Sequence, residues 1–128
     1  MKATERLAIF EKAAGKLRGK WILVEGLRDR KALSELGMTN ILTVSGNLNK
    51  SCDYLERSGA QEAYVLTDLD RRGHELAKRA REELEARSIR ADLEVRAQIA
   101  RSLRIKNIED AARAFERLKK EIEENKGE

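Results

Sequence analysis

The sequence contains one cysteine, no proline and few aromatic residues. A single cysteine, Cys52, excludes an internal disulfide and zinc clusters of the multi-cysteine kind. No apolar run approaches the roughly 20 residues of a membrane span. The amphipathic N-terminus carries acidic residues and is unlike a secretion signal. We therefore expect a protein of the reducing cytoplasm with no membrane part.

Charged residues are abundant instead. They make up 39% of the 128 residues, carry both signs and leave a net charge of +4, while hydrophobic residues make up 41%. This mixture indicates a folded protein with a highly charged surface rather than a disordered one. The length predicts a single domain spanning residues 1–128, with a core at about 20–95 and with an N-terminal helix and C-terminal helices packed on it.

Basic side chains concentrate in two segments. Residues 12–31 hold seven of them against two acids, and residues 96–106 hold four and no acid. The two sets are Lys12, Lys16, Arg18, Lys20, Arg28, Arg30 and Lys31, and then Arg96, Arg101, Arg104 and Lys106. Such patches suit a polyanion. Solvated faces of charged helices would produce the same pattern, so both interpretations stay open.

Strand and helix patterns alternate along the chain. Continuous apolar runs predict strands at 21–25, 41–45, 63–67 and 91–95, and apolar residues at helical spacing predict helices at 4–17, 28–36, 48–55, 72–87 and 96–104. A last helix is expected after Asn107, which would cap it. Continuous apolar strands that alternate with helices favour an α/β fold of three layers, with a mainly parallel four-stranded sheet covered by helices on both faces.

Acidic residues follow two of the predicted strands. Glu25 ends the first strand, Asp68 directly follows the third, and Asp70 comes two residues later. Because the carboxyl ends of parallel strands meet at one edge of a sheet, we expect the three to converge there. Carboxylates of this kind suit Mg²⁺, with Mn²⁺ as an alternative, and substrate phosphate can complete the coordination shell. Capping of the following helix by Asp70 would also explain the Asp-x-Asp pattern.

Two motifs narrow these possibilities. The stretch VEGLRDRKAL (24–33), with the later Leu-Gly and Ser-Gly turns, and the stretch TDLDRRGHELA (67–77) resemble the Toprim domain of topoisomerases, bacterial primases and ribosomal-RNA maturation ribonucleases. The resemblance covers about residues 20–95 and is closest to a small, stand-alone member of archaeal type. It implies a Rossmann-like Toprim fold.

The resemblance also implies residue roles. Glu25 would act as general acid or base at the scissile phosphodiester, Asp68 and Asp70 would hold magnesium, to which Glu25 could add a ligand, and Asp29 would support the loop. Gly26, Gly46 and Gly73 match the turns of the family. Topoisomerases of the family carry a third acid where this chain has Arg72, so one or two metal ions both stay open.

The residues expected to contact the substrate surround these acids. They are Arg28, Asp29, Arg30, Lys31, Gly46, Asn47, Arg71, Arg72, Gly73 and His74. Several have a structural alternative: His74 and Arg71 could be solvated, and Asn47 could hold the turn after Gly46.

Not every activity of the family is expected of this chain. A topoisomerase needs a tyrosine nucleophile and further domains, and Tyr54 and Tyr64 lie within a predicted helix and strand. We therefore expect Mg²⁺-dependent hydrolysis of nucleic acid, with RNA favoured over DNA, as in a maturation nuclease. The alternative is a non-catalytic module of the same fold that binds nucleic acid or a ribonucleoprotein. A partner protein or a second copy could pair with the outer helices.

Overall fold

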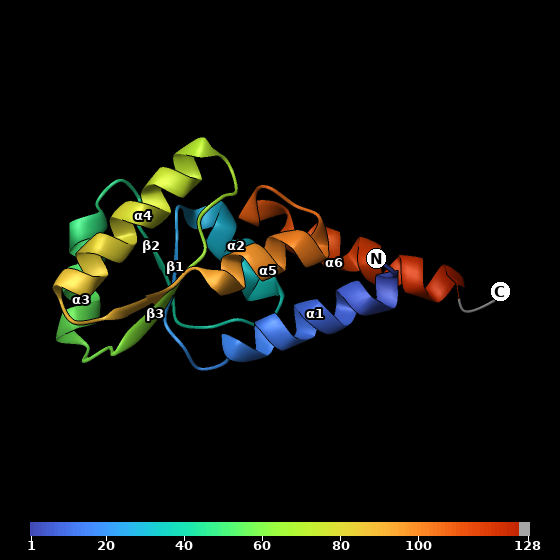
Figure 1. Cartoon of the computed structure of the whole chain (residues 1–128), viewed down its shortest axis with the longest axis horizontal. Coiled ribbons are helices and arrows are strands. Elements are labelled where there is room, and N and C mark those ends of the chain that lie inside the picture. Colours follow the sequence, from blue (N-terminus) through green and yellow to red (C-terminus); the bar gives the residue numbers. More distant parts are fainter. Residues whose placement is uncertain (126–128) are drawn as a thin grey trace.

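The computed structural model describes residues 1–125, which form a four-stranded sheet between two layers of helices (Figure 1). In chain order the elements are α1 (Ala3–Lys16), β1 (Ile22–Val24), α2 (Leu27–Glu35), β2 (Ile41–Thr43), α3 (Leu48–Arg57), β3 (Glu62–Val65), α4 (Arg71–Ala86), β4 (Arg90–Asp92), α5 (Glu94–Leu103), the 3-10 turn η1 (Ile108–Asp110) and α6 (Ala111–Asn125). The strand order is β2-β1-β3-β4, and every pairing is parallel. The α/β three-layer prediction is confirmed, and the sheet is parallel throughout.

Alternate strand residues face opposite helix layers, as the two-residue period of a strand requires. Ile22 and Val24 of β1 join a core with helices α1, α2, α5 and α6. Leu23 of β1 and Val65 of β3 point the other way, into a core with α3 and α4. Because β1 and the part of β3 after Glu62 are buried on both faces, their sequences are continuously apolar rather than alternating.

The first and last helices pack together on one side of the sheet. Phe10 of α1 stacks on Phe115 of α6 with ring centroids 4.9 Å apart. Arg6 is buried in the same layer, where its Nε donates to the carbonyl of Ser102 at 2.9 Å and its Nη1 donates to Glu121 at 3.2 Å. Figure 1 shows both helices extending beyond the sheet with the N-terminus near α6. That residues 1–128 form one domain stays a prediction.

Two predicted boundaries are wrong. The fourth strand ends at Asp92, and α5 begins at Glu94, so Val95 is helical and not part of a strand at 91–95. The Asp92 carboxylate accepts from the Val95 amide at 3.0 Å, which ends the strand and starts the helix. The side chain of Asn107 makes no capping bond, and η1 separates it from α6.

No helix within residues 1–125 is long and apolar enough to cross a membrane.

The start of α4 packs directly against the preceding loop. Gly73 lies in the first turn of the helix, and a Cβ atom at this position would stand 1.8 Å from the carbonyl oxygen of Asp68. The hydroxyl of buried Thr67 donates to the Gly73 carbonyl at 2.7 Å and holds the two segments together. Glycine is therefore required here by close approach of the backbone.

We expect Gly73→Ala to destabilise the protein by more than about 2 kcal/mol, because backbone rather than a flexible side chain opposes the new methyl group. Gly15→Ala in α1 is the matched control. Nothing lies within 4 Å of a Cβ there, so the same substitution should be neutral or stabilise by up to about 1 kcal/mol. Urea denaturation of both variants measures the difference, and equal stabilities would contradict the close-packing argument.

Candidate functional site

The strand order brings the acids of the first and third strands together. β1 and β3 are neighbours at the centre of the sheet, and the chain runs outward from them in opposite directions to β2 and β4. A crevice forms beyond the carboxyl ends of strands at such a switch in direction. Glu25 follows β1, and its Oε2 accepts a hydrogen bond from the backbone amide of Asp68 at 2.8 Å.

Each of the four acids at this edge accepts a backbone amide. Besides the bond to Glu25, Asp68 Oδ1 accepts from Ile108 N at 2.8 Å, Asp70 Oδ1 from Gly73 N at 2.7 Å, and Asp29 Oδ2 from Gly26 N at 3.1 Å. Asp70 is therefore the N-cap of α4, and buried Asp29 closes the turn that starts α2. These bonds fix one oxygen of each carboxylate and orient the other.

Burial, with repulsion between neighbouring carboxylates as a smaller cause, raises the pKa of two acids at this edge. Burial raises the pKa of Asp68 to about 6, with added repulsion from Asp29, Glu25 and Asp70, while the amide bond from Ile108 acts in the opposite direction. Burial also raises the pKa of Asp29, against the effect of its bond from the Gly26 amide. An extra positive charge at this edge would therefore be favourable.

Arg96 of α5 lies directly behind the acidic loop. It is 6% exposed, and it donates through Nε to the carbonyl of Thr67 at 2.8 Å and through Nη2 to the carbonyl of Asp68 at 2.6 Å. The same Nη2 lies 2.8 Å from Nδ1 of His74. A guanidinium group has no acceptor, so Nδ1 must accept and a proton on neutral His74 resides on Nε2. Burial lowers the pKa of the Arg96 guanidinium, and Asp68, Glu25 and Asp70 oppose that shift.

The exposed basic candidates lie in the first two turns of two helices. Arg28, Arg30 and Lys31 belong to α2, and Arg71 and Arg72 to α4. Both helices begin at the carboxyl edge of the sheet, where free amide groups and the helix dipole favour phosphate. Arg28 and Lys31 line an open cavity with Arg113 of α6. Arg72 lines a different cavity together with Glu25.

The remaining candidates have structural contacts of their own. Asn47 caps α3 by accepting from the amide of Lys50 at 3.1 Å, and Gly46 has a φ of 81° in the turn before it. Arg71 is exposed and pairs with Glu75 at 3.5 Å. His74 is exposed but bound to Arg96. Gly73 is buried beneath Asp68. Substrate contacts by these residues stay predictions.

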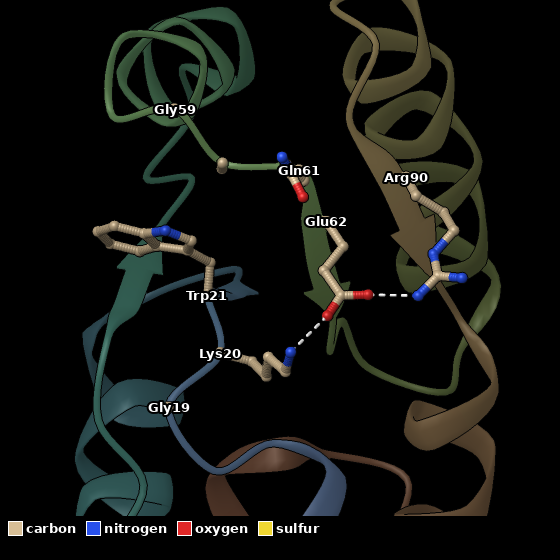
Figure 2. A pocket seen from close by; sticks show the side chains of 8 residues that line it. Gly19, Lys20, Trp21, Gly59, Gln61, Glu62 and Arg90 are labelled. Carbon is tan, nitrogen blue, oxygen red and sulfur yellow. Dashed lines mark hydrogen bonds and ion pairs between the residues drawn. The ribbon is translucent and has the colours of Figure 1, made fainter.

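A further cavity of about 580 Å³ opens at the amino ends of the strands, at the edge of the sheet opposite to Glu25 and Asp68. Figure 2 shows its charged side chains turned toward one another. Glu62 pairs with Lys20 at 2.8 Å and also with Arg90. These contacts lower the pKa of Glu62. Both cations of this cavity are engaged by Glu62, and none of the motif acids lies here, so we place the site at the opposite edge.

Comparison with known proteins identifies the family. Residues 20–102 match the Toprim domain. The chain belongs to the Toprim family. It is 36% identical to a UPF0292 protein of Pyrococcus abyssi over 89% of each chain, and 39% identical to a UPF0292 protein of Thermococcus onnurineus over 79% of each. A solved structure of a putative protein from Aquifex aeolicus superposes with a TM-score of 0.70 at 28% identity, covering 80% of this chain and 94% of that one.

Membership of the Toprim family implies metal-dependent processing of nucleic acid in general terms. Toprim domains typically bind divalent metal ions such as Mg²⁺. The matched relatives include archaeal proteins, as expected of the small Toprim type.

The acids of this Toprim chain fit a divalent ion by their chemistry. Within residues 1–125, the second oxygens of Glu25, Asp68 and Asp70 have no hydrogen-bond partner, and hard carboxylate oxygens are the ligands that Mg²⁺ prefers. In the same part of the chain, however, no three His, Cys, Asp or Glu side chains are already arranged around a common point. An ion held here would therefore depend on substrate phosphate and water for the rest of its shell.

Sequence reasoning missed two parts of this site. It counted Arg96 among basic residues suited to a polyanion, whereas the side chain is buried and donates to the acidic loop. It also missed the amide of Ile108, which holds Asp68 from a segment 40 residues away. A lone arginine directly after the predicted strand 91–95 is the only sequence signal for the buried Arg96, and no local signal exists for a backbone amide.

Arg96→Met should destabilise the protein by about 2–4 kcal/mol, because the carbonyls of Thr67 and Asp68 lose buried charged donors. Arg101→Met, on the exposed side of the same helix, makes the same chemical change and should cost less than about 1 kcal/mol. Chemical denaturation compares the two. Similar losses in both variants would contradict a structural role for Arg96.

The raised pKa of Asp68 predicts how stability varies with pH. Between the ordinary value of 3.8 and about 6 the folded state binds more protons than the unfolded state, so the contribution of Asp68 to the free energy of unfolding decreases as pH rises through this window. The loss is at most about 3 kcal/mol, and solvent screening of this partly exposed group reduces it. Asp68→Asn keeps an acceptor for the Ile108 amide and removes the charge.

In a chelator, we therefore expect Asp68→Asn to be at least as stable as the parent at pH 7.5 and to vary less between pH 4 and 6. Asp68→Ala is the control, because it removes the acceptor as well as the charge. It should be less stable than the asparagine variant by about 1–3 kcal/mol. An unchanged pH dependence in Asp68→Asn would show that Asp68 is not the titrating group.

Proposed function

We propose that this Toprim chain is a metal-dependent nuclease that hydrolyses phosphodiester bonds of nucleic acid, with RNA as the favoured substrate. The observation that carries the proposal is the hydrogen bond between Glu25 and the Asp68 amide at the central crevice of the sheet. It joins a candidate proton-transfer group to the loop that carries the candidate metal ligands. Two helix N-termini with basic first turns flank the same point.

The proposed reaction assigns one role to each acid. Glu25 Oε2 is held by the Asp68 amide, so Oε1 is the atom that would accept a proton from the attacking water and later return it to the leaving oxygen. Asp68 and Asp70 would hold Mg²⁺, or Mn²⁺ in its place, through their second oxygens. When bound, such an ion polarises the phosphodiester and favours ionisation of water. Asp29 keeps Glu25 in place by closing the Gly26 turn.

Exposed basic residues would guide the substrate backbone to Glu25. Arg28, Arg30 and Lys31 would do so from α2, and Arg71, Arg72 and His74 from α4. The tautomer imposed by Arg96 leaves the Nε2 proton of neutral His74 free to donate to a phosphate oxygen. Gly46, Asn47 and Gly73 would act through the shape of their turns, and Asn47 through its cap on α3.

A binding module without turnover is the second candidate function. It is favoured by the amide bonds that already satisfy one oxygen of Glu25, Asp68 and Asp70, and by the absence of a ready three-ligand cluster within residues 1–125. The same basic helix N-termini would then hold nucleic acid or a ribonucleoprotein, alone or with a partner protein or second copy. Cleavage assays separate the two functions.

With Mg²⁺ present, Glu25→Gln should reduce cleavage at least about 100-fold while changing nucleic-acid affinity less than about twofold. Glutamine keeps an acceptor for the Asp68 amide but cannot transfer a proton. Glu56→Gln, on the exposed surface of α3, is the matched control and should cleave like the parent. Single-stranded, duplex and structured RNA and DNA serve as substrates, and gel electrophoresis and fluorescence anisotropy measure cleavage and binding.

An Asp68→Asn, Asp70→Asn double variant tests whether these two residues bind the metal ion. Each asparagine keeps an oxygen that can accept the hydrogen bond from the Ile108 or Gly73 amide. The double variant should lose the heat of Mg²⁺ binding in calorimetry as well as cleavage. Binding by the parent without cleavage in Mg²⁺ or Mn²⁺ would favour the binding module. No affinity for either nucleic acid would remove both candidates.

A further inference from the structure

A cavity of about 250 Å³ lies beside Glu25, between α4 and the loop that joins β2 to α3. Its lining includes Glu25, Val44, Leu48, Arg72, Glu75, Leu76 and Arg79. The strand end, the loop and the helix that carry these residues are the elements that build the acidic edge. The cavity is therefore continuous with the proposed reaction centre, although Arg79 lies outside both motifs.

The cavity has an apolar floor, and its charged side chains are two arginines, Arg72 and Arg79, and two glutamates, Glu25 and Glu75. Val44 and Leu48 are 7% and 6% exposed and belong to the core beneath α3 and α4, and Leu76 packs against the same core. Arg72 and Arg79 stand on the same helix as Leu76, at a spacing of four and three residues that places all three on one face. Guanidinium groups over an apolar floor suit a flat, uncharged ring, because arginine stacks on aromatic faces.

The two arginines of the rim are available for a ligand. Within residues 1–125 neither makes an ion pair, whereas Arg71 and Arg81 of the same helix pair with Glu75 and Glu85. Their charges also offset the carboxylates of Glu25 and Glu75, the second of which pairs with Arg71 as well, so a phosphate could approach the rim without strong repulsion.

The size of the cavity limits what it can hold. Sites for drug-sized ligands begin at about 300 Å³, so a space of about 250 Å³ accepts one base with its sugar rather than two stacked nucleotides. A base inside a duplex must be unpaired and unstacked before it can enter such a space, which costs a few kcal/mol. A single strand supplies an unstacked base at much lower cost.

We propose that this cavity receives one unstacked nucleoside of a single-stranded nucleic acid, adjacent to the phosphodiester at Glu25. The proposal rests on the proposed function and specifies its substrate class: strands, loops or frayed ends rather than intact duplex. Arg79 stacks on the base and Arg72 contacts the flanking phosphate. Leu76 forms the floor against which the base lies.

The experiment measures binding of a labelled single strand of about twelve nucleotides, and of a fully abasic strand of the same length, by fluorescence anisotropy. Calcium replaces magnesium so that binding is measured without cleavage. Arg79→Ala should weaken binding of the normal strand about five- to tenfold, because it removes a stacking contact, and should change binding of the abasic strand less than about twofold. Arg81→Ala on the same helix has the same charge change and should alter neither by more than about twofold.

A second variant tests the space itself. Leu76→Phe places a bulkier side chain on the floor and reduces the volume of the cavity. It should therefore weaken binding of the normal strand and leave binding of the abasic strand unchanged. Thermal unfolding verifies that both variants fold. If Arg79→Ala and Leu76→Phe weaken binding of the abasic strand, or of a duplex, as much as binding of the normal strand, the proposed nucleoside cavity is wrong. The proposed function would not be affected by that result. No binding of any strand by the parent would overturn both.

Discussion

The acidic edge depends on one interaction, the clamp of the buried Arg96 guanidinium on the carbonyls of Thr67 and Asp68. Four carboxylates collect where the central strands end, and their mutual repulsion would spread a loop that had no such support. The guanidinium counters this charge from behind while its hydrogen bonds fix the backbone. The Ile108 amide adds a bond from the C-terminal segment. Helices outside the two motifs therefore maintain the geometry of the residues inside them.

This support from the protein interior leaves one oxygen of each of three carboxylates available for a ligand. The second oxygens of Glu25, Asp68 and Asp70 have no partner within residues 1–125 and lie beside two helix N-termini. A polyanion that approaches this edge would meet the amide dipoles of both helix N-termini and exposed basic groups on both helices, and the carboxylates at the centre would repel it. A divalent ion shared with phosphate would remove that last repulsion, which is why metal and substrate binding are expected to reinforce each other.

The basic residues of the chain divide into two classes that look alike in the sequence. Arg6 and Arg96 are buried and donate to backbone carbonyls, so they contribute to the packing of the helices rather than to the surface potential. Arg72 and Arg79 are exposed and make no ion pair in the described part of the chain. Counting charges along the chain therefore overestimated the polyanion surface near residue 96 and overlooked Arg79. Burial, which periodicity alone does not determine for a lone arginine, makes the difference.

The sequence by itself determined the layered α/β fold and the shared edge of Glu25 and Asp68, because unbroken apolar runs between helical patterns demand a sheet buried on both faces. It also determined the cap at Asp70, whose partner Gly73 is three residues away. Only the tertiary structure decided that Val95 starts a helix, that Arg96 lies beneath the loop and that the Ile108 amide meets Asp68. Those contacts join segments 28 and 40 residues apart, and their geometry arises only when α5 and η1 pack against the sheet.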